Sequence, residues 1–199
     1  KIYGKLVCRE KSELSCDSLS QLAQRLEISS LKLNHLCREM KIPYLKIDQY
    51  NDSCDFAHQL KPDLFVFTVG GILRKPFLEV PKLGTLNCHM GLLPKYRGMD
   101  VVEWPFVDGD RKTGITVHYM DAGLDTGDIL LTESIPLENG ETFLTARKRF
   151  GPKMVYAMLR TIEGLDRKRI CPKPQSIASG IQYFVMHKNI RDIAANRIN

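Results

Sequence analysis

Residues 63–69 read Asp-Leu-Phe-Val-Phe-Thr-Val, a run that is nearly continuous in apolar and β-favouring side chains. A strand covered on both faces of a parallel sheet has this composition, whereas a half-exposed strand alternates apolar and polar residues. Gly70 and Gly71 follow at once and permit the turn that ends such a strand. The stretch therefore predicts a central parallel strand.

Further strands and helices are predicted on either side of this run. Strands are expected at residues 4–8, 44–47, 85–89, 114–120 and 129–133, and apolar side chains at helical spacing predict helices at residues 19–26, 31–40, 52–60 and 76–80. Strands that alternate with helices favour an α/β layer fold with a mostly parallel sheet.

The last third of the chain is predicted to be largely helical. Residues 143–165 carry apolar side chains on one helical face, and Gly151-Pro152 interrupts them, so we expect a kink or two separate helices. A final amphipathic segment is expected from Ile181 to Ile198. We therefore divide the chain into a core at 1–140 and a C-terminal helical extension at 141–199, packed on the core.

Composition excludes several classes of protein. The sequence has no run of about 18 apolar residues that could span a membrane, and it has no secretory signal. Its six cysteines form no C-x-x-C pair, which argues against zinc ribbons and redox dithiols and favours a reduced, cytoplasmic setting. From Arg147 onward the sequence contains twelve Lys and Arg but only three acidic residues. This excess of positive charge suits either an anionic partner or a solvated helix face.

Three polar residues stand out as candidates for chemistry. Asn87 and His89 are two residues apart on a predicted strand, so they face the same side while Cys88 points away. An amide can stabilise the oxyanion of a tetrahedral intermediate, and an imidazole can move protons near neutral pH. Asp125, in a glycine-containing turn, could orient that imidazole. Taken alone, however, an Asn-x-His pair is more often structural.

A longer pattern surrounds these residues. Residues 87–98 read Asn-Cys-His-Met-Gly-Leu-Leu-Pro-Lys-Tyr-Arg-Gly, and residues 120–129 read Met-Asp-Ala-Gly-Leu-Asp-Thr-Gly-Asp-Ile. Between them lie Trp104 and the segment 113–118, Thr-Gly-Ile-Thr-Val-His. In order and spacing these segments resemble the signature of 10-formyltetrahydrofolate-dependent formyltransferases, which contains N-x-H-x-S-L-L-P-x-Y-R-G. The resemblance is specific over about residues 61–133.

The resemblance implies a Rossmann-like α/β domain with helices on both faces, the formyltransferase fold, and 10-formyltetrahydrofolate as co-substrate. Asn87, His89 and Asp125 match the catalytic residues of the family. In that role Asn87 and protonated His89 would stabilise the oxyanion as an amine attacks the formyl carbon, and Asp125 would assist proton movement. The segments that match the folate-binding loops contain Gly71, Ile72, Leu73, Asp121, Ala122, Gly123 and Leu124. No metal is implied.

The sequence also departs from the family pattern. The usual His-Pro-Ser is His89-Met90-Gly91 here, and the Pro expected after Arg97-Gly98 is absent. We place Gly91 and Arg97 on the acceptor side as substrate-binding residues, although Arg97 could equally be structural. Family members begin with one more strand and helix, so residues 1–9 correspond to the second strand of the family.

Several alternative interpretations remain open at this stage. Asp128 could replace Asp125, although it is better interpreted as a turn residue. We expect His118 to serve in packing or strand hydrogen bonding rather than in the site, and Trp104 to lie in the core. A nucleophile triad of Cys88, His118 and Asp125 would instead make the protein a thiol-dependent amidohydrolase.

Two further alternatives concern ligands rather than nucleophiles. A metal site formed by His89, His118 and Asp121 has no close ligand spacing to support it. A degenerate family member that only binds folate is disfavoured by the complete set of Asn, His and Asp.

The amine acceptor is the least determined part of the hypothesis. The tail around residues 182–187 looks similar to that of sugar-nucleotide formyltransferases, so an amine on a nucleotide-linked sugar, which bears phosphate, is the first choice. Methionyl-tRNA and glycinamide ribonucleotide are the alternatives; a nucleic acid is not expected, and neither is a membrane. A homodimer is left open.

Overall fold

The computed structural model describes residues 32–46, 54–68 and 70–196, together with Gln21, Gln24 and Glu27. The strand expected at residues 4–8 and most of the helix expected at 19–26 lie outside the described residues. The described elements are α2 (Leu33–Glu39), α3 (Cys54–Leu60), β1 (Phe65–Phe67), α4 (Lys75–Leu78), β2 (Thr85–His89), β3 (Tyr96–Gly98), α5 (Trp104–Asp108), β4 (Lys112–Tyr119), β5 (Ile129–Pro136), α6 (Phe143–Asp166), the 3₁₀ turn η3 (Ile177–Ser179), β6 (Ile181–Tyr183) and α7 (Lys188–Asn196).

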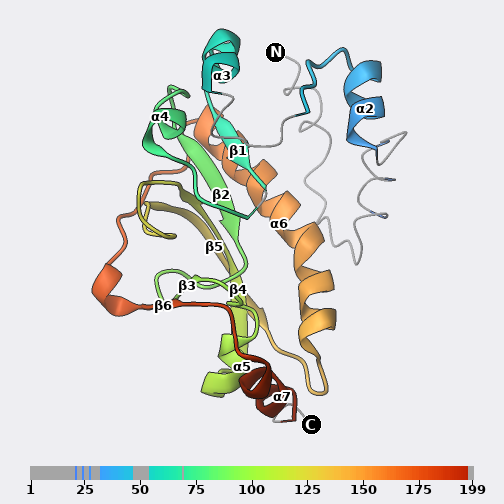
Figure 1. The fold of residues 1–199 in the computed structure, drawn as a ribbon, viewed down its shortest axis with the longest axis vertical. Coiled ribbons are helices and arrows are strands. Elements are labelled where there is room, and N and C mark those ends of the chain that lie inside the picture. Colours follow the sequence, from blue (N-terminus) through green and yellow to red (C-terminus); the bar gives the residue numbers. More distant parts are fainter. Residues whose placement is uncertain are drawn as a thin grey trace.

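The main sheet has the strand order β1-β2-β4-β5 (Figure 1). β1 and β2 are parallel, but β2–β4 and β4–β5 are antiparallel. The α/β class is therefore confirmed, while the expectation of a mostly parallel sheet is wrong for the described strands. For β4 and β5 the reason is the connection at residues 120–128, which contains no helix and returns the chain as a wide hairpin.

β1 is shorter and more exposed than its composition predicts. It covers three of the seven predicted residues, and Val66 is 41% exposed. Among the described strands β1 pairs only with β2, so it occupies an edge of this part of the sheet. The strand expected at 44–47 is also absent from residues 44–46, and Ile47 lies outside the described part.

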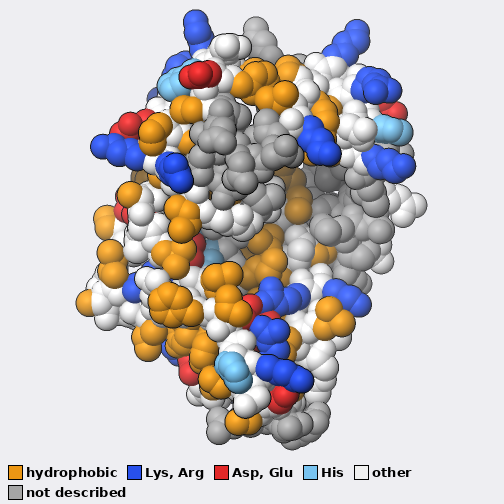
Figure 2. Space-filling model, viewed as in Figure 1, with side chains coloured by type: hydrophobic (Ala, Val, Ile, Leu, Met, Phe, Trp, Pro, Cys, Tyr) orange, Lys and Arg blue, Asp and Glu red, His pale blue; other side chains and the backbone are white. Residues whose placement is uncertain are grey.

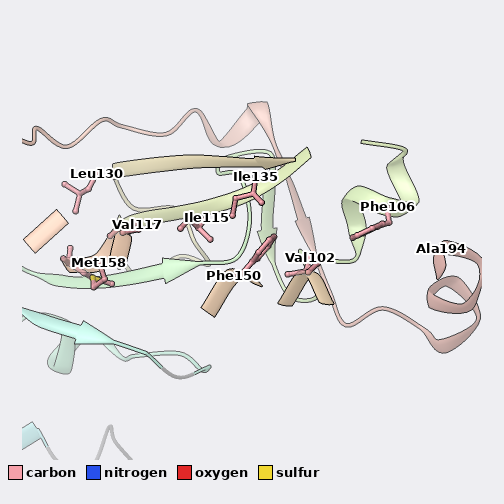
Figure 3. Packing of buried hydrophobic residues seen from close by; sticks show 12 residues of the cluster. Val102, Phe106, Ile115, Val117, Leu130, Ile135, Phe150, Met158 and Ala194 are labelled. Carbon is pink, nitrogen blue, oxygen red and sulfur yellow. The ribbon is translucent and has the colours of Figure 1, made fainter. Parts of the chain in front are cut away.

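The hydrophobic core lies between one face of the sheet and α6 (Figure 3). Phe150 and Met158 of α6 belong to the same buried cluster as Ile115 and Val117 of β4. α6 runs unbroken through Pro152, so the two-helix alternative is wrong. A proline removes only one intrahelical hydrogen bond, and buried side chains on both sides of it keep the helix on the sheet.

The chain after α6 forms what we call the C-terminal strap, residues 171–196. The amphipathic segment expected at 181–198 is in fact β6 followed by α7. β6 pairs in parallel with β3, and the ring of Tyr183 lies 5.4 Å from that of Tyr96 and 4.8 Å from that of Trp104, measured between centroids. Trp104 is thus half-buried under the strap rather than in the core. The division at residue 140 stays a prediction.

Arginines at the start of α6 are engaged in ion pairs within the protein. Arg147 contacts Glu103 at 2.7 Å and Asp100 at 3.4 Å, and Arg191 of α7 contacts Asp100 at 2.7 Å. Figure 2 shows Lys and Arg side chains gathered near α7 and the adjoining end of α6. Part of the positive charge of the last third of the chain therefore stabilises the docking of α7.

Candidate active site

The predicted Asn and His lie on one face of β2, and β4 adds two residues to that face. The register pairs Asn87 with His118 and His89 with Thr116. Because side chains alternate along a strand, these four residues share the face opposite to the α6 core. His118, which the sequence analysis assigned to packing, therefore belongs to the candidate site. Its alternation with Thr116 was visible in the sequence, but its register against β2 was not.

Asp125 approaches both histidines from the turn between β4 and β5. Its carboxylate lies 3.4 Å from Nδ1 of His89 and 3.5 Å from Nε2 of His118. The backbone N–H of Gly98 donates to the same carboxylate at 2.9 Å. The three groups named from the sequence are thus close together, and Asp125 rather than Asp128 faces the imidazoles.

Backbone carbonyls determine which ring nitrogen of each histidine carries a proton. Nε2 of His89 lies 2.7 Å from the carbonyl oxygen of Tyr96, and Nδ1 of His118 lies 2.7 Å from that of Tyr119. A carbonyl only accepts, so both nitrogens are N–H donors. In the neutral rings the opposite nitrogens, which face Asp125, then carry lone pairs.

This tautomer also fixes the orientation of the Asn87 amide. Nδ2 of Asn87 lies 3.3 Å from Nε2 of His118, which accepts because its other nitrogen donates to Tyr119. The amide N–H that bonds to His118 leaves the second N–H of Asn87 for another acceptor.

Burial and charge shift the pKa values of two of these groups. Burial lowers the pKa of His89, against the opposing effects of the Asp125 carboxylate and the Tyr96 carbonyl. Burial would raise the pKa of Asp125, but the close contact with His118, the nearby His89 and the N–H of Gly98 together lower it. The site therefore favours a neutral imidazole beside an ionised carboxylate.

The turn after β2 is held by buried hydrogen bonds to Thr116. Its hydroxyl donates to the carbonyl of Gly91 at 2.7 Å and accepts from the N–H of Leu93 at 3.2 Å. A Cβ at Gly91 would lie 2.9 Å from both Nε2 of His89 and the carbonyl oxygen of Tyr96. Glycine in place of the serine of the signature thus leaves room for the hydrogen bond between His89 and Tyr96.

The other predicted binding residues occupy less determined positions. Residues 70–73 follow β1, which ends at Phe67 opposite Asn87, so this segment leaves the sheet beside the site; there Ile72 is exposed and Leu73 is buried. In residues 121–124, Oδ1 of Asp121 accepts from the N–H of Gly123 and from the hydroxyl of Thr126. That segment is a turn stabilised by its own contacts.

Arg97, expected on the acceptor side, contacts the C-terminal strap instead. Its side chain is buried, and its guanidinium donates to the carbonyls of Ile177 at 2.8 Å and Gly180 at 3.3 Å. These contacts favour the structural interpretation of Arg97. A role in binding the acceptor stays a prediction.

Cys88 does not join the site. It packs against the core cluster on the opposite face of β2. Burial, with a smaller effect of Glu133, raises the pKa of its thiol to about 12. A nucleophilic cysteine needs an accessible thiolate, so the thiol-dependent amidohydrolase hypothesis is disfavoured.

Two structural features bear on the remaining alternatives. Within the described ranges, no group of three or more His, Cys, Asp and Glu is arranged to hold a metal ion. Among the helices of these same ranges, none combines the length and apolar character needed to cross a bilayer.

An α/β fold with Asn87 and His89 on one strand and Asp125 on a turn beside them is the arrangement expected of a formyltransferase-like protein. Residues 45–162 match the model of the family described as Formyl transferase. The match covers more than half of the chain, so the chain belongs to the formyl transferase family. This confirms the resemblance inferred from residues 87–98 and 120–129.

Known proteins similar to this chain include several methionyl-tRNA formyltransferases. That of Clostridium tetani is 32% identical over 175 residues, which is 87% of this chain and 56% of the relative. That of Pelobacter propionicus is 40% identical over 119 residues, which is 59% of this chain and 37% of the relative. The chain thus spans about a third to just over half the length of these relatives.

Solved structures support the fold. Glycinamide ribonucleotide transformylase 1 from Symbiobacterium toebii superposes with a TM-score of 0.62 at 22% identity, over 71% of this chain and 74% of that protein. At this identity the likeness establishes the formyltransferase fold and no more.

Proposed function

We propose that this chain transfers a formyl group from 10-formyltetrahydrofolate to a primary amine. The observation that carries the proposal is the cluster in which Asp125 lies within 3.5 Å of a ring nitrogen of both His89 and His118, while Asn87 contacts His118. Membership of the formyl transferase family gives the cluster its chemistry.

Asn87 is the proposed oxyanion donor. When an amine attacks a formyl carbon, the carbonyl oxygen becomes negative, and a preoriented N–H lowers the free energy of that state. The contact with His118 holds one N–H of the amide and so orients the other. His118 acts here as a positioning residue.

His89 and Asp125 are proposed to take the proton that the attacking amine loses and to return it to the donor nitrogen, which leaves when its bond to the formyl carbon breaks. Nε2 of His89 already donates to Tyr96, so His89 offers a lone pair at Nδ1, 3.4 Å from the carboxylate of Asp125. A proton that arrives at Nδ1 forms an imidazolium beside an anion, a favourable pair in a buried site. This geometry favours a proton acceptor over the protonated oxyanion donor expected from the resemblance.

The folate co-substrate supplies the formyl group when it is bound. We assign its ring system to residues 70–73 and 121–124, as the family resemblance implies. Two observations fit the assignment: β1 delivers the first segment next to Asn87, and the second belongs to the turn that carries Asp125.

The relatives change the preferred acceptor. Methionyl-tRNA formyltransferases similar to this chain are 32% to 42% identical to it. These relatives favour methionyl-tRNA, the second choice of the sequence analysis, over a nucleotide-linked amino sugar. We therefore propose the α-amino group of methionyl-tRNA as the first acceptor to test. One solved structure with a sugar nucleotide is the formyltransferase PseJ from Anoxybacillus kamchatkensis, "in complex with UDP-4,6-dideoxy-4-formamido-L-AltNAc and tetrahydrofolate". It superposes with a TM-score of 0.56 at 24% identity, over 62% of this chain and 65% of that protein. At this identity the likeness supports the fold and does not bear on the acceptor.

The experiment is a panel of amines incubated with the protein and 10-formyltetrahydrofolate, with release of tetrahydrofolate as the readout. Charged methionyl-tRNA, a UDP- or dTDP-linked amino sugar and glycinamide ribonucleotide are compared with uncharged tRNA as a control. Acceleration by charged methionyl-tRNA alone supports the proposed acceptor. Acceleration by the amino sugar instead refutes that acceptor while keeping the reaction, and no acceleration by any amine refutes the reaction.

A further inference from the structure

The C-terminal strap passes directly behind the turn that carries Asp125. An antiparallel bridge joins Ile129 to Lys173, with both N–H···O contacts at 2.8 Å. In an antiparallel pair, moving two residues back on one chain corresponds to moving two forward on the other. The bridge therefore places Gln175 opposite Gly127.

The side chain of Gln175 is bonded to the backbone of this turn. Nε2 of Gln175 donates to the carbonyl oxygen of Asp125 at 3.1 Å and also to that of Gly127. One amide nitrogen with two hydrogens thus holds two carbonyls that are two residues apart. Neither bond involves the carboxylate of Asp125, so its contacts with the histidines are unaffected.

The backbone that Gln175 holds is unfavourable for an ordinary residue. Asp125 has φ of 53°, in the left-handed region that side chains other than glycine rarely adopt. A Cβ at Gly127 would collide with the carbonyl oxygen of Tyr119, so the turn has little room to rearrange locally. Contacts from outside must therefore hold the conformation that points the carboxylate at the imidazoles.

The strap supports the carboxylate from a second side as well. The N–H of Gly98 donates to Oδ2 of Asp125, and Gly98 lies in β3, opposite Tyr183 of β6. Gln175 holds the backbone of Asp125, and β6 braces the strand that holds its carboxylate. Both supports belong to a part of the chain some fifty or more residues away in sequence.

We propose that Gln175 is a positioning residue for Asp125: it fixes the turn so that the carboxylate lies between His89 and His118. The inference deepens the proposed function, on which its activity readout rests. Gln175 itself touches neither histidine in any contact described above, and its effect on catalysis passes through Asp125.

Three variants test the role. Gln175→Ala removes both donated hydrogen bonds, and Gln175→Glu keeps the shape but sets carboxylate oxygens against two carbonyls. Gln182→Ala is the matched control, because Gln182 is an exposed glutamine on the same strap. We expect kcat to fall about tenfold or more in both Gln175 variants, since a misplacement of about 1 Å can cost up to about a hundredfold. KM and the Gln182→Ala variant should change little.

Nitrogen NMR of the imidazoles provides a readout that does not depend on turnover. In wild type the resonances of His89 and His118 report the nearby carboxylate, and both Gln175 variants should shift them towards their values in Asp125→Asn. Melting temperatures confirm that each variant is folded. Wild-type histidine resonances in both Gln175 variants would overturn the inference, whether or not the protein is active. If the Gln175 variants show altered resonances but the wild-type protein transfers no formyl group to any amine, the positioning role stands and the proposed function is refuted.

Discussion

The histidines and the carboxylate of the candidate site are held in contrasting ways. His89 and His118 sit on paired strands, so the ladder between β2 and β4 fixes their backbone. Asp125 sits on a turn with a left-handed backbone and depends on bonds from Gly98 and Gln175. The register of the sheet therefore determines where the rings lie, whereas contacts from residues distant in sequence determine where the carboxylate lies.

The largest effect is expected from removing the negative charge of Asp125 at the centre of the site. Asp125→Asn keeps an acceptor for the N–H of Gly98 but removes the anion beside His89. We expect formyl transfer to slow by about a thousandfold, within the range found for loss of acid–base groups, while the far-UV circular dichroism stays that of wild type. His89→Ala should lose as much. Near-normal turnover in either folded variant would disprove the assignment.

A smaller loss is expected from the strand-borne partner of Asn87. His118→Phe keeps a ring but removes the nitrogen that accepts from the Asn87 amide, so the amide is no longer held in one orientation. We expect kcat to fall about a hundredfold with little change in KM for the folate. His35→Phe, on an exposed face of α2, is the control and should behave as wild type. Equal activity of the two variants would return His118 to a packing role.

The pH dependence of activity tests the electrostatic contrast between His89 and Asp125. Burial lowers the pKa of His89 from its ordinary value of 6.5, and Asp125 opposes the shift. If neutral His89 accepts the proton, kcat/KM falls on acidification with a midpoint below 6.5. Removing the anion lowers the pKa further, so Asp125→Asn should move the midpoint of its residual activity to lower pH. A midpoint that moves up would contradict this account.

The same pKa shift affects stability with a definite sign. Unfolded His89 binds a proton near its ordinary pKa of 6.5, but the folded protein resists protonation there. The unfolded state then holds more protons below that pH, so the free energy of unfolding decreases as the pH falls through this region. His89→Gln should flatten that decrease in urea titrations at pH 7 and pH 5.

A moderate effect is expected at Gly91, whose missing side chain leaves room for the imidazole ring of His89. Gly91→Ala adds a Cβ at 2.9 Å from both partners of the hydrogen bond between His89 and Tyr96. Either the ring or the backbone must shift, so we expect about a tenfold loss of kcat. Gly140→Ala is the control: its φ of 73° means that alanine there costs stability, but a Cβ at Gly140 would have no heavy atom within 4 Å. A Gly91→Ala protein with full activity would show that the ring position tolerates change.

The smallest effect is expected from Cys88, which lies on the core-facing side of β2, opposite to Asn87 and His89. Cys88→Ala alters the core side of β2, so we expect less than a twofold change in kcat/KM and a loss of stability of about 1 kcal/mol. Alkylation with iodoacetamide should likewise leave formyl transfer intact. Strong inhibition would reopen the thiol mechanism.

Much of this arrangement is predictable from local sequence. Strand alternation placed Asn87 with His89 and turned Cys88 away, because side-chain direction follows from the backbone alone. The lengths of β2 and α6 also followed closely from apolar patterning. These properties depend on neighbours within a few residues.

What the sequence did not reveal depends on distant partners. His118 joined the site through the register between β2 and β4, and Gln175 through a bridge formed across more than forty residues. The apolar run at 63–69 predicted a buried central strand, yet burial depends on what covers the faces, and Val66 is exposed. Arg97 matched a signature position, but its guanidinium serves the strap.

Because side chains alternate along β4, the number of residues in this strand decides which side chains reach the site. An insertion of one residue between Ile115 and His118 would turn the imidazole into the core and bring an aliphatic side chain to Asp125, while a two-residue change would keep the faces and only slide the strand. A single-residue insertion between Ile115 and His118 should therefore abolish activity, although the irregular register beside Val117 and His118 shows that the ladder with β5 accommodates a local change.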